Sequence, residues 1–155
     1  KAQRTAEFKN ELTPAERLLG MIKRAGKLPT INTFVDAYNV VSVDSGLTIG
    51  AHDLVKLKGD LEFVILKDDK EFIPMGAKEK AIAKKGEYAI TDSLGNVLCR
   101  MDVRQDDESK ITKNTKNAVL EVQGNLKTND KLLEEKLKEA CELIVKYCGG
   151  RYKIF

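Results

Sequence analysis

The stretch Leu28–Asp60, LPTINTFVDAYNVVSVDSGLTIGAHDLVKLKGD, decides the fold expected for this chain. Its helical pattern places Asn32, Asp36 and Asn39 on one stripe beside an apolar face, because residues three and four positions apart are neighbours on a helix. A glycine-rich turn follows and delivers the only histidine, His52. These features predict the wall of a small pocket. A half-buried helix whose polar residues cap turns or face water is the alternative interpretation.

Length and composition predict one domain over residues 1–155 with its own hydrophobic core. The formal net charge of +3 permits a nucleic-acid partner without requiring one, since RNA binding depends on clustered positive charge. The three cysteines lack metal-binding spacing and indicate reduced thiols in a cytoplasmic protein. The sequence contains neither a signal-peptide pattern nor an apolar run of membrane-spanning length, so no membrane association is expected. It says nothing about the oligomeric state.

The rest of the sequence predicts an α+β fold, in which a mostly antiparallel sheet packs with flanking helices. The expected helices cover 13–26, 31–45 and 129–148, and the first begins at a capping Thr13 with Glu16 three residues on. The expected strands cover 61–66, 87–91, 97–103 and 118–122, with 71–74 returning as the partner of 61–66 and 151–155 as a closing strand. The segment 104–116 is polar throughout and is expected to be a loop outside the core.

The residues by themselves name no enzyme class. One histidine, no CxxC motif and scattered acids do not predict a metal site, and no cofactor is expected. The adjacency of His52 and Asp53 is not a nucleophile–base pair, because no serine or cysteine motif accompanies it. A lone histidine is more often a structural hydrogen-bonding group than a base. The glycine spacing also differs from phosphate-binding and dinucleotide-binding fingerprints.

The run VDAYN, ten residues, then GAHDLVKLKGDLEF resembles the editing module of the phenylalanyl-tRNA synthetase β subunit and its freestanding relatives. The resemblance covers nearly everything from 28 to 150. Downstream it rests on Gly86-Glu87, Asp92, Cys99-Arg100, Arg104-Gln105, Ile111-Thr112, Thr115-Lys116-Asn117 and Tyr147-Cys148-Gly149-Gly150. In that family the module hydrolyses the ester of a tRNA that carries the wrong amino acid. Positioned polar groups orient a water, and neither a metal nor a protein nucleophile is needed.

The resemblance implies a site for this chain. The family's asparagine and aspartate fall on Asn39 and Asp36, which become catalytic candidates together with His52. The glutamate that reads a tyrosine hydroxyl in the family falls on Glu121. The remaining substrate-binding candidates are Tyr38, Gly50, Ala51, Met101 and Asp102.

Two departures from the family pattern bear on activity. Gly50 stands where the family has a histidine, and Met101-Asp102 replaces a small Ala-Gly floor. We therefore expect either an aminoacyl-tRNA deacylase acting on aromatic esters or a non-catalytic module that binds RNA, an amino acid or a protein. If tRNA is the partner, the polar connections supply candidate phosphate contacts, and a solvated loop is the alternative for them. These candidates are Lys84, Lys85, Lys113 and Lys116.

Overall fold

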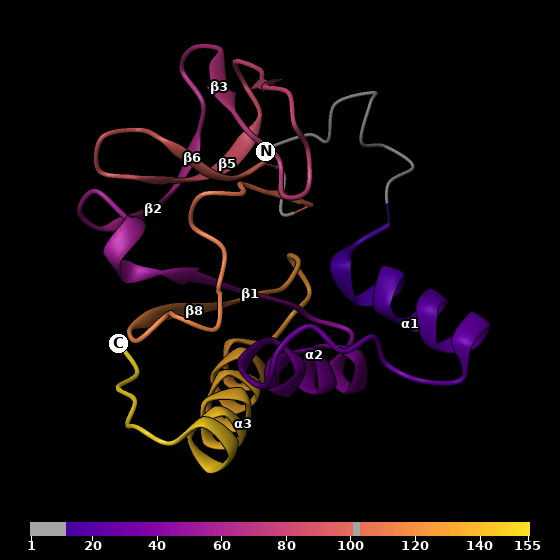
Figure 1. Ribbon diagram of the computed structural model, residues 1–155. Helices are drawn as coiled ribbons and strands as arrows, with labels where there is room; N and C mark the ends of the chain where they lie inside the picture. The colour runs from indigo at the N-terminus through magenta and orange to yellow at the C-terminus, as the bar shows by residue number, and fades with distance from the viewer. Residues whose placement is uncertain (1–11, 101–102) are drawn as a thin grey trace. The chain divides into compact units, whose positions relative to one another are not determined.

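A computed structural model describes residues 12–100 and 103–155 (Figure 1). The chain forms two compact units. One comprises His52–Lys110 and Thr115–Val119, and we call it the sheet unit; the other, the helical unit, comprises Thr13–Ala51, Ile111–Asn114 and Leu120–Phe155. Helices and antiparallel sheets together give the α+β fold that the sequence predicts.

The helical unit contains α1 (Pro14–Ala25), α2 (Thr33–Ser45) and α3 (Asp130–Cys148), and α2 packs against both of the others. Each helix begins at a side chain that caps its first turn. For α1, the Thr13 hydroxyl accepts a hydrogen bond from the Glu16 N–H at 3.3 Å, and the Glu16 carboxylate accepts one from the Thr13 N–H at 2.8 Å. All three predicted helices are confirmed, and their ends agree with the prediction to within two residues.

Strands β1 (Thr48–Asp53) and β8 (Ala118–Gln123) form a two-stranded sheet, and each strand runs from one unit into the other. The sequence does not predict β1, because Gly50 and the preceding glycine are typical of a turn. The turn prediction is right only at Gly46, whose φ of 71° ends α2 in the left-handed region that favours glycine. A short 3-10 turn, η2 (Leu54–Lys56), follows β1.

In the sheet unit, the antiparallel order is β2-β5-β6-β7, formed by β2 (Leu61–Ile65), β5 (Tyr88–Asp92), β6 (Val97–Arg100) and β7 (Arg104–Gln105). A separate hairpin joins β3 (Lys70–Phe72) to β4 (Ala81–Ala83). The expectation that 71–74 returns as the partner of the first strand is wrong, because β2 pairs with β5 instead. The predicted closing strand at 151–155 is also wrong, since these residues form neither helix nor strand.

The central strands of the sheet unit bury both of their faces. Ala89 packs in one apolar cluster and its neighbour Ile90 in another, and Val97 and Leu98 divide between the same two clusters. Successive residues of a strand point to opposite faces, so a strand with both faces buried is apolar at consecutive positions. This explains why these strands could be predicted from the sequence.

The turn between β5 and β6 is organised by the buried carboxylate of Asp92. Its Oδ1 accepts hydrogen bonds from the N–H groups of Leu94 and Asn96 at 3.1 and 3.0 Å, and its Oδ2 accepts one from Lys58 N–H at 3.1 Å. One side chain thus fixes the hairpin and the incoming segment before β2.

Candidate functional site

The candidate site in the helical unit is built on α2, β1 and β8. Tyr38 and Asn39 are buried on α2, and Glu121 is buried on β8. The phenol of Tyr38 is close enough to Glu121 and Asp36 that their negative charges raise its pKa, after the larger effect of burial itself. Tyr38 is also held by an edge-to-face contact with the Phe34 ring, at 6.2 Å between centroids.

Gly50 permits the position of the Glu121 carboxyl group. A Cβ built on Gly50 would lie 3.0 Å from Cδ of Glu121 and closer still to Oε1, so a side chain here would displace the carboxyl group. Burial raises the pKa of Glu121 to about 8, against a smaller lowering by its own backbone N–H. At neutral pH this group is therefore mostly protonated, and a protonated carboxyl group has one O–H donor in addition to its acceptor capacity.

Asp36 and Asn32 have defined roles at the start of α2. The Asp36 carboxylate accepts a hydrogen bond from the Ile31 N–H at 2.8 Å, and Asn32 is the N-cap, whose Oδ1 accepts one from the Val35 N–H at 3.0 Å. The three residues of the predicted polar stripe therefore have different surroundings. Asn39 is buried beside Tyr38, Asp36 is half-buried and also acts on Tyr38 through its charge, and Asn32 serves the helix end.

His52 lies in the sheet unit within a chain of buried polar groups. Its Nδ1 is 2.6 Å from Ser109 Oγ, and the amide nitrogen of Gln105 is 3.3 Å from the same atom. The Ser109 hydroxyl donates to the Asp106 carboxylate, so its oxygen is left to accept from the His52 Nδ1–H. Burial lowers the pKa of His52 to about 4, which keeps the ring neutral at physiological pH.

The segment 104–116 forms no helix or strand from 107 onward, as the prediction of a loop requires, but it does not lie outside the core. Asp106, Ser109 and Ile111 are buried. Asp106 and Ser109 can be buried because they hydrogen-bond to each other and Ser109 contacts His52. Burial raises the pKa of Asp106, and the hydrogen bonds from Ser109 oppose that rise. The catalytic role of His52 stays a prediction, and its contacts are those of a structural hydrogen-bonding group.

Of the remaining predicted substrate-binding residues, only one lies in the part of the chain that the structure describes. Ala51 is buried on β1, with 1% of its surface exposed, next to Gly50. Met101 and Asp102, the predicted pocket floor, lie outside the described residues.

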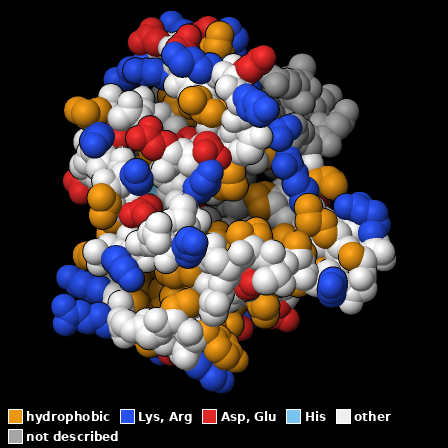
Figure 2. All heavy atoms as spheres, viewed as in Figure 1, with side chains coloured by type: hydrophobic (Ala, Val, Ile, Leu, Met, Phe, Trp, Pro, Cys, Tyr) orange, Lys and Arg blue, Asp and Glu red, His pale blue; other side chains and the backbone are white. Residues whose placement is uncertain are grey.

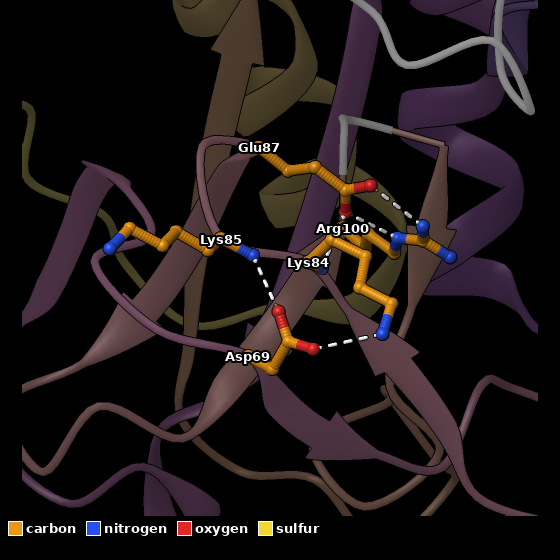
Figure 3. A network of polar contacts seen from close by, with 5 residues as sticks. All are labelled: Asp69, Lys84, Lys85, Glu87 and Arg100. Atoms are coloured by element: carbon orange, nitrogen blue, oxygen red, sulfur yellow. Dashed lines mark hydrogen bonds and ion pairs between the residues drawn. The ribbon is translucent and has the colours of Figure 1, made fainter.

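Sequence reasoning missed a buried ion pair in the sheet unit, shown in Figure 3. Arg100 donates from Nε to Glu87 Oε2 at 2.6 Å and from Nη2 to Glu87 Oε1 at 2.8 Å, and both side chains are buried. Glu87 also accepts from the Lys84 N–H at 3.0 Å. The partners are 13 residues apart, with Arg100 on β6 and Glu87 just before β5, so no local spacing signals the pair.

The predicted RNA-contacting lysines are exposed, but one is already paired. Lys84 Nζ lies 2.8 Å from Asp69 Oδ2, and the Lys85 N–H donates to the same carboxylate (Figure 3). Lys116 is in the sheet unit and Lys113 in the helical unit. Over the sheet unit, in the upper part of Figure 2, Lys and Arg side chains are interspersed with Asp and Glu side chains.

Within residues 12–100 and 103–155, no group of three or more His, Cys, Asp or Glu side chains could hold a metal ion. No helix among the described residues is long and apolar enough to span a membrane.

The fold is that of a phenylalanyl-tRNA synthetase-like module. It is similar to a crystal structure of an N-terminal fragment of the phenylalanyl-tRNA synthetase β-subunit from Pyrococcus horikoshii, with a TM-score of 0.62 and 18% sequence identity. The match covers 74% of this chain and 40% of that one, so the chain corresponds to less than half of the fragment. The sequence model of the B3/4 domain family matches residues 4–149, and the chain therefore belongs to the B3/4 domain family. No curated protein matches it.

Proposed function

We propose that this chain is an aminoacyl-tRNA editing-type domain that hydrolyses the ester of tRNA mischarged with an aromatic amino acid. The proposal places it in the cytoplasm, with tRNA as its partner and the amino-acid moiety in the helical unit. The observation that carries it is the grouping of buried Tyr38 and Glu121 with half-buried Gly50, and with Asn39 next to Tyr38 on α2.

Glu121 supplies the selectivity in this proposal. A carboxyl group with a pKa of about 8 is mostly neutral at pH 7 and remains able to pair with a phenolic hydroxyl. A tyrosyl ester would satisfy that group, whereas a phenylalanyl ester would leave a buried polar group unsatisfied, at a cost of about 1–3 kcal/mol. Sites built around a hydroxyl partner discriminate better than apolar slots do.

The reaction step needs only an oriented water and a polarised ester. Hydroxide character at the water develops as it attacks the ester carbonyl carbon, and the bond to the terminal ribose oxygen then breaks with a proton returned to that oxygen. Asn39 is proposed to orient these groups through its amide, which donates and accepts hydrogen bonds but does not ionise. Asp36 assists indirectly, by fixing the start of α2 that carries Asn39.

A non-catalytic binding module is the second candidate, and one observation favours it. Gly50 replaces the histidine that the resemblance places there, and the Glu121 carboxyl group occupies the space that a side chain at this position would need. Such a protein would retain an amino-acid or tRNA-end pocket without the group that the editing family has at this point.

A deacylation assay decides between the two candidates. The substrates are one tRNA charged with tyrosine or with phenylalanine, and the proteins are wild type, Glu121→Ala, Asn39→Ala and the exposed control Lys127→Gln. We expect wild type and control to prefer the tyrosyl ester, Glu121→Ala to lose that preference, and Asn39→Ala to slow both reactions. Hydrolysis of neither ester by folded wild type, with retained binding of the tRNA, would establish the binding module instead.

The proposed RNA contacts have a separate test. If Lys84, Lys85, Lys113 and Lys116 contact phosphates, tRNA affinity should fall steeply with salt, with a slope of roughly 0.7–0.9 per neutralised phosphate. Replacing Lys113 or Lys116 with Gln should lower that slope by roughly 0.7–0.9, the value for one neutralised phosphate. Binding that is insensitive to salt would remove the lysines from the proposal without affecting the pocket.

A further inference from the structure

Strand β2 lies at one edge of the antiparallel sheet in the sheet unit, beside β5, and no described strand pairs with its other side. An edge strand presents a row of unpaired N–H and C=O groups, which natural proteins protect with lysine, proline or a bulge. The sequence of β2 is LEFVI, and its register with β5 has no bulge. The free side of this strand, which we call the β2 edge, therefore lacks the usual protection against pairing.

The hydrogen bonds at the end of β2 show which backbone groups lie on the free side. Leu66 donates its N–H to the Glu87 carbonyl at 2.9 Å, and its carbonyl accepts from the Gly86 N–H at 2.8 Å. In an antiparallel pair, alternate residues bond to the neighbouring strand and the others point their N–H and C=O groups away from it. Counted back from Leu66, the residues that point away from β5 are Leu61, Phe63 and Ile65. Among the described residues, no backbone hydrogen bond outside the β2–β5 pair involves them.

The side chains along the β2 edge are apolar and partly open to solvent. Phe63 is 53% exposed and Ile65 is 49% exposed. They lie on the same face of the sheet, because they are two residues apart on one strand. The Phe63 ring stacks on the Tyr88 ring of β5, with 6.4 Å between the ring centroids. The β2 edge thus combines free backbone groups with uncovered apolar side chains, and this combination favours pairing with another strand.

The sequence of β2 is complementary to itself in one antiparallel register. When Phe63 of one copy lies opposite Phe63 of another, Leu61 lies opposite Ile65. Each of these residues points its backbone groups to the free side, so each pair exchanges two hydrogen bonds. On the other face, Glu62 lies opposite the apolar Val64. A register centred on Glu62 would instead place two like charges directly opposite each other, which destabilises a strand pair.

The charges beyond the ends of β2 also suit this pairing. Antiparallel strands bring the residues before β2 in one copy to the same end as the residues after β2 in the other. Lys58 and Asp60 precede the strand, Lys67 and Asp68 follow it, and all four are exposed. The next acid, Asp69, is already paired within its own copy. Each end therefore brings both signs of charge together without an excess of either, which favours this orientation of the two copies.

We propose that the β2 edge pairs antiparallel with the β2 edge of a second copy of this chain, which joins the two four-stranded sheets into one. The Phe63 rings of the two copies then lie opposite each other, as an aromatic cross-strand pair of the kind that stabilises sheets. A two-fold axis through this pair makes the interface self-complementary and closed, so association stops at the dimer. The proposal is independent of the editing activity, since β2 carries none of the candidate site residues.

The first test measures association with a matched pair of variants. Sedimentation equilibrium of the full chain between roughly 5 and 500 µM gives the dissociation constant of the dimer. Ile65→Pro removes an N–H group from the free side and spares the bonds to β5, because proline is accepted where the N–H of an edge strand faces solvent. Ile65→Ala keeps that N–H and controls for the shortened side chain. We expect a wild-type dimer whose dissociation constant rises at least ten-fold more in Ile65→Pro than in Ile65→Ala.

A second pair of variants tests the register. Phe63→Lys and Phe63→Glu each place like charges opposite each other at the two-fold axis, so each variant alone should be monomeric where wild type is dimeric. An equimolar mixture should associate again, because the opposite charges then face each other. Circular dichroism and urea unfolding check that both variants are folded. If either variant does not fold, the Ile65 variants decide the question.

Hydrogen exchange of the wild-type protein gives a readout that needs no substitution. The amides of Phe63 and Ile65 should become protected as the protein concentration rises. The amides of Glu62 and Val64 face β5 and should be protected at every concentration, so they serve as controls.

Four results would overturn the proposal. One is a folded wild-type monomer at roughly 500 µM. Another is a dimer in which Ile65→Pro and Ile65→Ala associate equally well, or in which the Phe63 and Ile65 amides exchange as fast as in the monomer, which would place the contact elsewhere. The third is failure of the folded Phe63 variants to associate when mixed. The last is protection of the Phe63 and Ile65 amides in a monomer, which would show that a segment of the same chain covers the β2 edge.

Discussion

Replacing Glu121 with Gln should change how the stability of the protein depends on pH. The folded-state pKa of Glu121 is about 8 and its ordinary value is 4.5, so between these values the folded state holds a proton that the unfolded state has released. Stability from this group is fully present below the ordinary value and is lost as pH rises toward 8. The slope is about 1.4 kcal/mol per pH unit, on the order of 4–5 kcal/mol over the whole interval.

Gln has nearly the same shape as the protonated carboxyl group and does not titrate. Urea unfolding of both proteins at several values between about pH 5 and pH 8 gives the difference in their free energies of unfolding. We expect wild type to be at least comparable at the acidic end and to fall progressively behind the variant as pH rises. A difference that stays constant over this range would refute the burial of a neutral Glu121, and with it the hydroxyl-reading role.

Three further predictions concern other buried groups. Glu87→Ala should lower the free energy of unfolding by about 3–5 kcal/mol, because it leaves the Arg100 charge buried without its partner. Replacing both residues by Met should lower it by less than the sum of the two single replacements, which a double-mutant cycle in urea measures. Gly50→Ala should lower the free energy of unfolding by about 1–3 kcal/mol and lower the pKa of Glu121, because the new methyl group pushes the Glu121 carboxyl group toward water. An unchanged dependence of stability on pH would contradict this. His52→Gln should reduce the loss of stability as the pH falls from 6.5 to about 4. In this interval the unfolded chain binds a proton at His52 that the buried neutral ring does not, and Gln removes that difference. Equal acid sensitivity of the variant and wild type would contradict this.

The helices could be predicted because their signals are local. Thr13 with Glu16, and the glycines that end each helix, act over three or four residues and are visible in the sequence. The strands with both faces buried, β5 and β6, were predicted for a similar reason, since each contains adjacent apolar residues, Ala89-Ile90 and Val97-Leu98.

The missed features depend on partners distant in sequence. Ser109 looks like a loop residue until His52, 57 positions earlier, is placed against it. Gly50 is typical of a turn in the sequence. The structure shows that it lies on a strand, where the Glu121 carboxyl group leaves no space for a side chain. Of the candidate site, a resemblance pointed to Asn39 and Glu121, whose roles stay predictions. The contacts of Asn32 and Asp36 at the start of α2 agree with the alternative interpretation, in which polar residues of this helix cap turns.

The division of each unit among separate segments has a consequence for synthesis on the ribosome. Helix α2 packs against α3, and the two are separated by the whole sheet unit in the sequence. The apolar side of α2 therefore stays uncovered in the nascent chain until Asp130–Cys148 has left the exit tunnel. Contacts between segments so far apart are slow to form, and exposed apolar surface invites chaperones and aggregation in the meantime. The last helix to be synthesised therefore completes the burial of α2, which carries Tyr38.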